Sequence, residues 1–153
     1  MAWVIRVGLV ALSLSIAPGA PAAGGATTAQ TASTPLDRVL DTYVREGHVY
    51  YRALQSERKL LDAYVRALDL PAALVAAWPK AKPLAFWVNA YNALVLQTVI
   101  DKYPITGKAE DYPAASIRQI PGAFEQRPHR VAGQTLTCER THSSSNTARS
   151  TGG

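Results

Sequence analysis

The chain has 153 residues, a net charge of +5 at pH 7 and a single cysteine. This length allows one domain with a modest core, and one cysteine excludes a disulfide within the chain. The basic residues are scattered among acidic ones and form no run of like charge, so we expect no binding of nucleic acid.

The N-terminus has the residue order of a signal peptide. Arg6 lies in the short first segment, residues 7–16 are apolar, and Ala20-Pro21-Ala22 supplies the small residues that signal peptidase requires. The apolar segment has about ten residues, whereas a membrane span needs roughly 20. We therefore expect a signal peptide over residues 1–22, export to the periplasm or the medium, and no membrane association after cleavage. The alternatives are an uncleaved anchor and a buried N-terminal helix.

The composition divides the rest of the chain into three parts. Residues 23–35 contain no large apolar side chain, which predicts a disordered linker. Residues 36–137 carry the periodic apolar pattern of a folded domain. Residues 138–153, CERTHSSSNTARSTGG, have one cysteine and one alanine as their only apolar residues. We expect this last segment to be a disordered tail, either native or produced by translation in a wrong frame.

Apolar residues recur at helical spacing in four stretches. The first follows Thr34, which we expect to be its N-cap, and is expected to end with Gly47 as its C-terminal cap. The second covers about 52–68, a short third helix reaches Trp78, and the fourth runs over about 84–103.

The remaining segments predict extended or irregular structure. Residues 48–51 are too few for a helix and suit an extended crossover, and the prolines and glycines of 105–124 predict a loop with short turns. Residues 129–137 predict a β-hairpin that turns at Ala132-Gly133. The pattern as a whole predicts an α+β fold: a mainly helical fragment of about four helices with a small C-terminal hairpin, forming an incomplete domain.

The fourth helix carries two asparagines in an otherwise apolar stretch. Asn89 and Asn92 lie three residues apart and therefore share a face. The helix is apolar nearly all round, which indicates a central, buried position; its polar residues make a membrane span over 84–100 costly. A buried amide without a partner costs roughly 1–3 kcal/mol. We therefore expect both asparagines to be buried and bonded to the backbone of a crossing loop.

The alternative for the asparagines is a site, because amides can orient a catalytic histidine or stabilise an oxyanion. Together with Tyr51 and Tyr91, Asn89 and Asn92 are the candidate polar residues of either a cleft or the core. No catalytic residue can be assigned from the pattern.

The other candidate chemistry is incomplete. Cys138 with His48, His129 or His142 would make a nucleophile–base pair, but the cysteine lies in the segment expected to be mobile. Ser56 and Lys59 have Ser-x-x-Lys spacing without the motifs that accompany it in acylating enzymes. The three histidines lack metal-ligand spacing and no glycine-rich phosphate loop is present, so we expect no metal and no cofactor.

The segment AFWVNAYNALVLQTVIDKYP, residues 85–104, resembles the signature helix of the family called domain of unknown function 547. That helix reads Phe-Trp-x-Asn-Ala-Tyr-Asn-Ala and ends in Tyr-Pro. HVYYRAL upstream, and SIRQIPGAF and HRVAGQTLT downstream, extend the resemblance over about 36–137. It implies no established activity. The matching residues are Phe86, Trp87, Asn89, Ala90, Tyr91, Asn92, Ala93, Tyr103 and Pro104.

The resemblance stops at Thr137. In the family the last strand leads into an acidic, histidine-bearing helix and then into segments with cysteines. This chain therefore resembles a truncated or frame-shifted member. Cys138 and His142 are not expected to correspond to site residues of the family. We expect an exported protein with a binding or scaffolding role, or an inactive fragment. The alternative is the N-terminal part of a hydrolase-like exported enzyme. The partner is unknown, and an uncovered strand edge after Thr137 would favour self-association.

Overall fold

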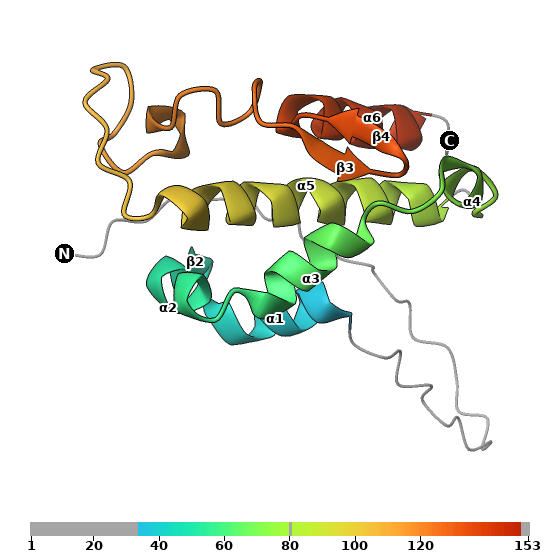
Figure 1. Ribbon diagram of the computed structural model, residues 1–153, viewed down its shortest axis with the longest axis horizontal. Coiled ribbons are helices and arrows are strands. Elements are labelled where there is room, and N and C mark those ends of the chain that lie inside the picture. Colours follow the sequence, from blue (N-terminus) through green and yellow to red (C-terminus); the bar gives the residue numbers. More distant parts are fainter. Residues whose placement is uncertain (1–33, 80, 151–153) are drawn as a thin grey trace, which may run out of the picture.

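The computed structural model describes residues 34–79 and 81–150 (Figure 1). The expected signal peptide and nearly all of the expected linker lie outside these residues. The described residues form six α-helices and two antiparallel two-stranded sheets, one of them a hairpin near the C-terminus. The fold is therefore α+β and mainly helical, which confirms the fold class that the sequence predicted.

The helix α5 (Ala81–Lys102) lies in the middle of the fold, between two layers (Figure 1). The first layer holds α1 (Pro35–Tyr43), α2 (Tyr51–Ser56) and α3 (Lys59–Ala67). The second holds the hairpin of β3 (His129–Val131) and β4 (Gln134–Leu136) and the last helix, α6 (Cys138–Ser150). The short α4 (Ala72–Ala76) lies near the N-terminal end of α5.

The start of α1 was predicted correctly and its end was not. The Thr34 hydroxyl accepts from the Asp37 amide at 3.2 Å, and the Asp37 carboxylate accepts from the Thr34 amide at 2.8 Å. After Tyr43 the chain enters a hairpin of β1 (Val44–Arg45) and β2 (His48–Val49). Its turn residues, Glu46 and Gly47, have φ of 52° and 77°. Both central residues of a type I′ hairpin turn need positive φ, so Gly47 serves this turn rather than capping a helix, and 48–51 is no crossover.

The single helix expected over 52–68 is broken in two. The chain leaves helical geometry at Glu57, where φ is −119° and ψ is 39°, and α3 begins at Lys59. Glu57 accepts a hydrogen bond from the hydroxyl of Tyr43 at 3.1 Å, which ties the break to α1. Leu54 before the break and Leu61 after it are both fully buried, so the break lets both helices pack on the core.

Two apolar clusters cover α5 on different sides. The first joins Ala93, Leu96, Val99 and Ile100 of α5 to α1, α2 and α3. The second joins Trp87, Ala90 and Leu94 to the β3–β4 hairpin and α6. By length and composition, residues Lys82–Lys102 would suffice to cross a membrane. In this fold the helix α5 needs apolar residues around most of its surface because other elements bury it on two sides.

The C-terminal end of α5 is held by a distant side chain. The Gln55 amide nitrogen donates to the carbonyl oxygens of Ile100 at 2.6 Å and Tyr103 at 3.0 Å. The last carbonyls of a helix have no partner within the helix. Gln55 therefore links α2 to the end of α5 by satisfying two of these carbonyls.

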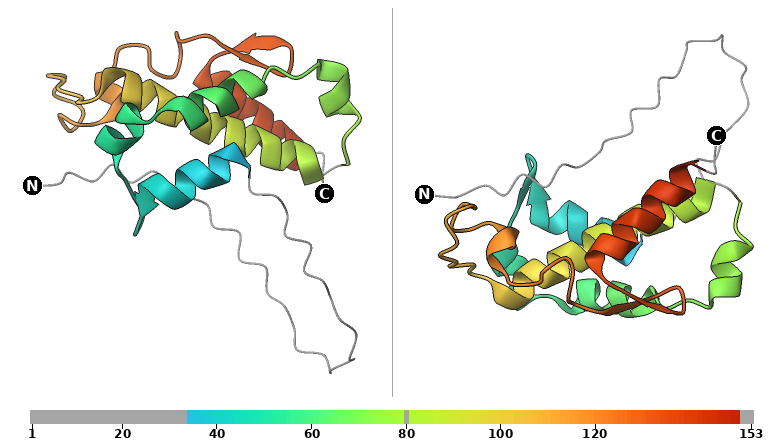
Figure 2. Two further views of the ribbon diagram at one scale, coloured as in Figure 1. Left: turned by 60° about the horizontal axis from the view of Figure 1, so that its bottom comes forward. Right: turned by 90° about the horizontal axis from the view of Figure 1, so that it is seen from above.

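Residues 138–150 form the helix α6, so the expectation of a disordered tail is wrong for them. The buried side of α6 is made of small residues, Cys138, Thr141 and Ser145, and it packs on α5 (Figure 2). The Thr141 hydroxyl donates to the Thr137 carbonyl at 2.9 Å, and the Ser145 hydroxyl to the His142 carbonyl at 2.6 Å. Because these hydroxyls are satisfied within the chain, a polar helix can cover an apolar face.

Replacing Gln55 by Glu should destabilise the fold by about 1–3 kcal/mol, because a carboxylate oxygen would then face two carbonyl oxygens. Urea unfolding followed by circular dichroism measures this change. Gln126→Glu makes the same substitution at an exposed site and should stay within about 0.5 kcal/mol of wild type. Equal effects of the two substitutions would show that Gln55 does not hold α5.

Deleting residues 138–153 should lower the free energy of unfolding by at least about 2 kcal/mol, because uncovering one buried leucine costs roughly 1.5–3 kcal/mol. Leu94, Val131 and Leu136 belong to the cluster that α6 covers. Urea unfolding of the shortened chain measures the loss, and a hydrophobic dye should bind to it. An unchanged unfolding midpoint would contradict the packing of α6.

Candidate functional site

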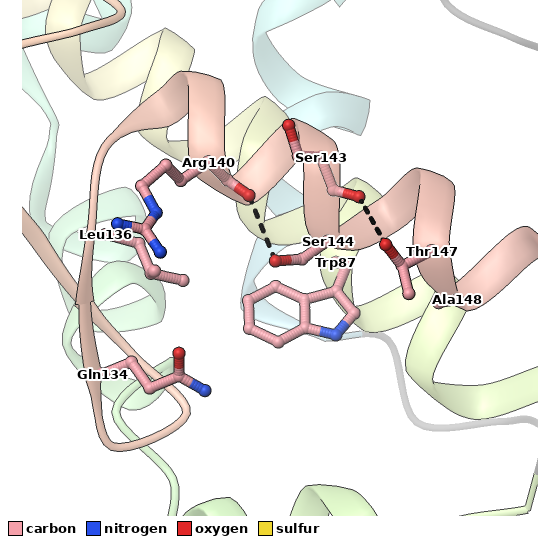
Figure 3. Close-up of a pocket in the computed structure, with 8 residues that line it drawn as sticks. All are labelled: Trp87, Gln134, Leu136, Arg140, Ser143, Ser144, Thr147 and Ala148. Atoms are coloured by element: carbon pink, nitrogen blue, oxygen red, sulfur yellow. Dashed lines mark hydrogen bonds between the residues drawn. The ribbon is translucent and has the colours of Figure 1, made fainter.

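A groove lies between α6, β4 and the N-terminal half of α5 (Figure 3). Its volume is about 540 Å³. Its walls come from α5 and, much later in the sequence, from the consecutive elements β4 and α6. The lining side chains are Trp87, Gln134, Leu136, Arg140, Ser143, Ser144, Thr147 and Ala148.

Trp87 forms the floor of the groove and retains only 9% of its surface exposed. Its ring meets Phe86 edge-on, with centroids 5.1 Å apart, and Phe86 meets Trp78 in the same way at 5.3 Å. The ammonium of Lys82 lies 4.4 Å from the centre of the Trp78 ring. Edge-to-face pairs prefer specific ring orientations, so this row of rings fixes the position of the Trp87 indole.

The α6 wall of the groove is polar. Arg140, Ser143, Ser144 and Thr147 follow the spacing that places residues on one side of a helix. The Ser144 hydroxyl donates to the Arg140 carbonyl at 3.1 Å, and the Thr147 hydroxyl to the Ser143 carbonyl at 3.2 Å (Figure 3). A hydroxyl oxygen that donates its proton keeps lone pairs as acceptors, so Ser144 can still accept from a ligand.

Arg140 is the only charged residue among those that line the groove. The guanidinium of Arg140 is exposed and makes no ion pair or hydrogen bond with another described residue. No aspartate or glutamate lines the groove. The groove therefore offers a positive charge and a planar set of donors to whatever enters it.

Asn89 and Asn92 lie away from this groove. Asn89 is two positions from Trp87, a rotation of about 200° around the helix, and neither asparagine lines the groove. Both are only partly buried, and neither side chain makes a hydrogen bond within the described residues. The expectation that they are buried and bonded to a loop is therefore wrong. The first cluster packs on α5 from Ala93 onward, so the asparagines lie at its margin, where water can reach them.

The two candidate tyrosines lie in different elements, Tyr91 in the middle of α5 and Tyr51 at the start of α2. The ring of Tyr91 packs against that of His142, with centroids 5.3 Å apart, and burial raises the pKa of Tyr91. Tyr51 packs against Tyr103 at 5.8 Å. Its buried hydroxyl has no hydrogen-bond partner among the described residues, and burial raises its pKa to about 12. The structure does not bring Tyr51 and Tyr91 together with the asparagines into one cleft.

Cys138 and His129 are held in unreactive forms. Cys138 is 1% exposed, and burial raises the pKa of its thiol more than the neighbouring Thr98 and Arg127 lower it. Although Thr98 lies beside this thiol, no hydrogen bond of ordinary geometry joins the Thr98 hydroxyl to the thiol or to any other described residue. His129 is buried, and its Nε2 has no hydrogen-bond partner in the part of the chain that the structure describes. Burial, aided by Arg127, lowers its pKa to about 4 against the opposing effect of Asp101. A nucleophilic cysteine requires the thiolate, which this environment disfavours.

Arginines bind the carboxylates of Asp62 and Asp101. Arg58 lies 2.7 Å from Asp62 and 2.7 Å from Asp101, and Arg127 also pairs with Asp101. The hydrogen bond from Arg58 lowers the pKa of Asp62. Among the described residues no three His, Cys, Asp or Glu side chains are grouped as a metal site would require. These ion pairs join α3, α5 and the segment before β3.

Ser56 and Lys59 form no acylating site. The Ser56 hydroxyl is exposed and donates to the Arg52 carbonyl at 3.1 Å, within its own helix. Lys59 begins the next helix, beyond the break at Glu57. The break separates the two residues that the Ser-x-x-Lys spacing would place on one helical face.

The chain matches no family model, and neither the curated proteins nor the solved structures yield a match. The resemblance of residues 36–137 to the domain of unknown function 547 family therefore stays a prediction. Sequence reasoning missed the groove because five of its residues, including Arg140, lie in the segment expected to be disordered. The sequence did carry a signal of a packed helix in this segment, because the small residues Cys138, Thr141 and Ser145 recur at helical spacing.

Acidification should destabilise the fold through His129. The unfolded side chain binds a proton near its ordinary pKa of 6.5, whereas the folded one does so only near about 4. The unfolded state thus binds more protons between these values, and stability present above about pH 6.5 is lost as the pH falls toward 4.

His129→Gln should remove the part of the acid-induced loss of stability that comes from His129. His48→Gln changes an exposed histidine and should lose stability with falling pH as wild type does. Urea unfolding at a series of pH values between about 7 and 4.5 measures both profiles. The interpretation is wrong if the His129→Gln protein loses stability over this range as steeply as wild type.

Proposed function

We propose that this protein is an exported binding protein whose groove over Trp87 holds a small ligand. The observation that supports binding is the combination of an apolar aromatic floor with a polar wall whose arginine has no ion-pair partner among the described residues. Small-molecule sites combine a largely apolar lining with a few placed polar groups in this way. Export is proposed from the charged, apolar and small residues over 1–22.

Binding accounts for the geometry better than catalysis. A hydrolase needs an activated nucleophile and a base within hydrogen-bond reach. Cys138 is buried as a thiol, His129 is buried in its neutral form, and neither lines the groove. The groups that do line it, Arg140, Gln134 and the hydroxyls, are suited to holding a ligand by hydrogen bonds and charge.

Filling the groove should abolish ligand binding without unfolding the protein. Ser144→Tyr places a ring over Trp87, since Ser144 lines the groove above the indole. Ligand-observed NMR with a set of sugars, organic acids and amino acids should find binders of the wild-type chain that this variant no longer binds.

The matched control is Asn146→Tyr. It adds the same ring to an exposed position of α6 that does not line the groove, and it should bind ligands like wild type. Circular dichroism checks that both variants are folded. If no compound in the set binds, or if Ser144→Tyr binds as well as wild type, the groove is not a binding site.

A further inference from the structure

We infer that the ligand of the groove is a sugar that carries a carboxylate, such as a short chain of uronic acid units. This inference rests on the proposed binding function and adds the chemical class of the ligand. Three features of the groove support it: its charge, its apolar floor and the polar groups of its wall and edge.

The charge selects an anion. Four other described arginines, Arg58, Arg118, Arg127 and Arg130, pair with aspartate or glutamate. Arg140 instead reaches the groove with its guanidinium unpaired among the described residues. The guanidinium donors match a carboxylate in a two-point hydrogen-bonded contact. Since no acidic side chain lines the groove, nothing in the lining competes for Arg140.

The floor selects a ligand with an apolar face. Trp87 and Leu136 are almost fully buried, so only a limited patch of each remains open to the groove, beside Ala148. A pyranose ring presents carbon-bound hydrogens on one face, and that face can rest on an indole. The volume of about 540 Å³ lies within the range of roughly 300–1,000 Å³ for small-molecule sites, and it leaves room for more than one sugar ring.

The polar groups select a ligand that donates as well as accepts. The Ser144 proton is used within α6, so its oxygen offers lone pairs to a donor from outside. Gln134, on the β4 side, is exposed and can both donate and accept. Sugar hydroxyls supply donors for these acceptors, whereas benzoate and inorganic phosphate dianion supply few or none. A carboxylated sugar therefore satisfies Arg140, Trp87 and Ser144 together.

Isothermal titration of the full chain with digalacturonate tests the inference, and its dimethyl ester serves as the neutral counterpart with the same rings. Wild type should bind the acid at least about tenfold more tightly than the ester, a difference of about 1.4 kcal/mol. Raising the salt concentration should weaken binding of the acid more than that of the ester, because exposed charges are screened.

Arg140→Gln should bring the affinity for digalacturonate down to that of the ester, and Arg140→Lys, which keeps the charge without the planar donors, should give an intermediate value. Arg149→Gln removes the same charge from an exposed position of α6 outside the groove and should bind like wild type. Arg140 is itself exposed, so these variants should fold, and circular dichroism checks this.

Equal affinity for acid and ester, or full affinity in Arg140→Gln, would overturn the carboxylate assignment. Tighter binding of benzoate than of digalacturonate would overturn the assignment of a sugar. Failure of digalacturonate to bind at all would also overturn the inference. In each of these cases the proposed binding function survives if Ser144→Tyr still abolishes binding of some other compound, and it fails if no compound depends on the groove.

Discussion

The rest of the structure depends on the need to cover α5 on nearly all sides. Its 22 residues are apolar around most of the helix, and such a helix is stable in water only when other elements bury it. The helices α1, α2 and α3 supply large aliphatic and aromatic side chains on one side. The hairpin and α6 must cover another side, although the last part of the chain contains few large apolar residues.

Small residues solve this second packing problem and also create the groove. Cys138, Thr141 and Ser145 let α6 approach α5 closely and bury Leu94. A helix of small residues cannot enclose a side chain as large as tryptophan on all sides, so Trp87 remains the floor of an open groove. The candidate site thus follows from the contrast in side-chain size between two packed helices.

Some polar side chains hold the fold, and others face the groove. Gln55 caps α5, Asp69 accepts from the Gly133 amide at 3.1 Å in the turn of the second hairpin, and the carboxylates of Asp62 and Asp101 are neutralised by arginines. Each of these groups is satisfied inside the protein. Arg140 differs from these groups because its guanidinium has no ion-pair partner among the described residues. Its charge can therefore pair with an anionic ligand.

Local patterns in the sequence determined the elements whose signals lie within a few residues. The N-cap at Thr34, the long apolar helix before Tyr103 and the hairpin turn at Ala132-Gly133 all depend on neighbouring residues, and the structure confirms them. The break at Glu57, the first hairpin, the partial exposure of Asn89 and the helical state of 138–150 depended on packing between distant segments. A polar segment such as α6 has no local reason to be buried; it becomes an ordered part of the protein only because α5 presents an apolar surface that its small residues fit. For the same reason the groove exists only in the tertiary structure, where Trp87 and Arg140, 53 positions apart in the chain, are brought to one place.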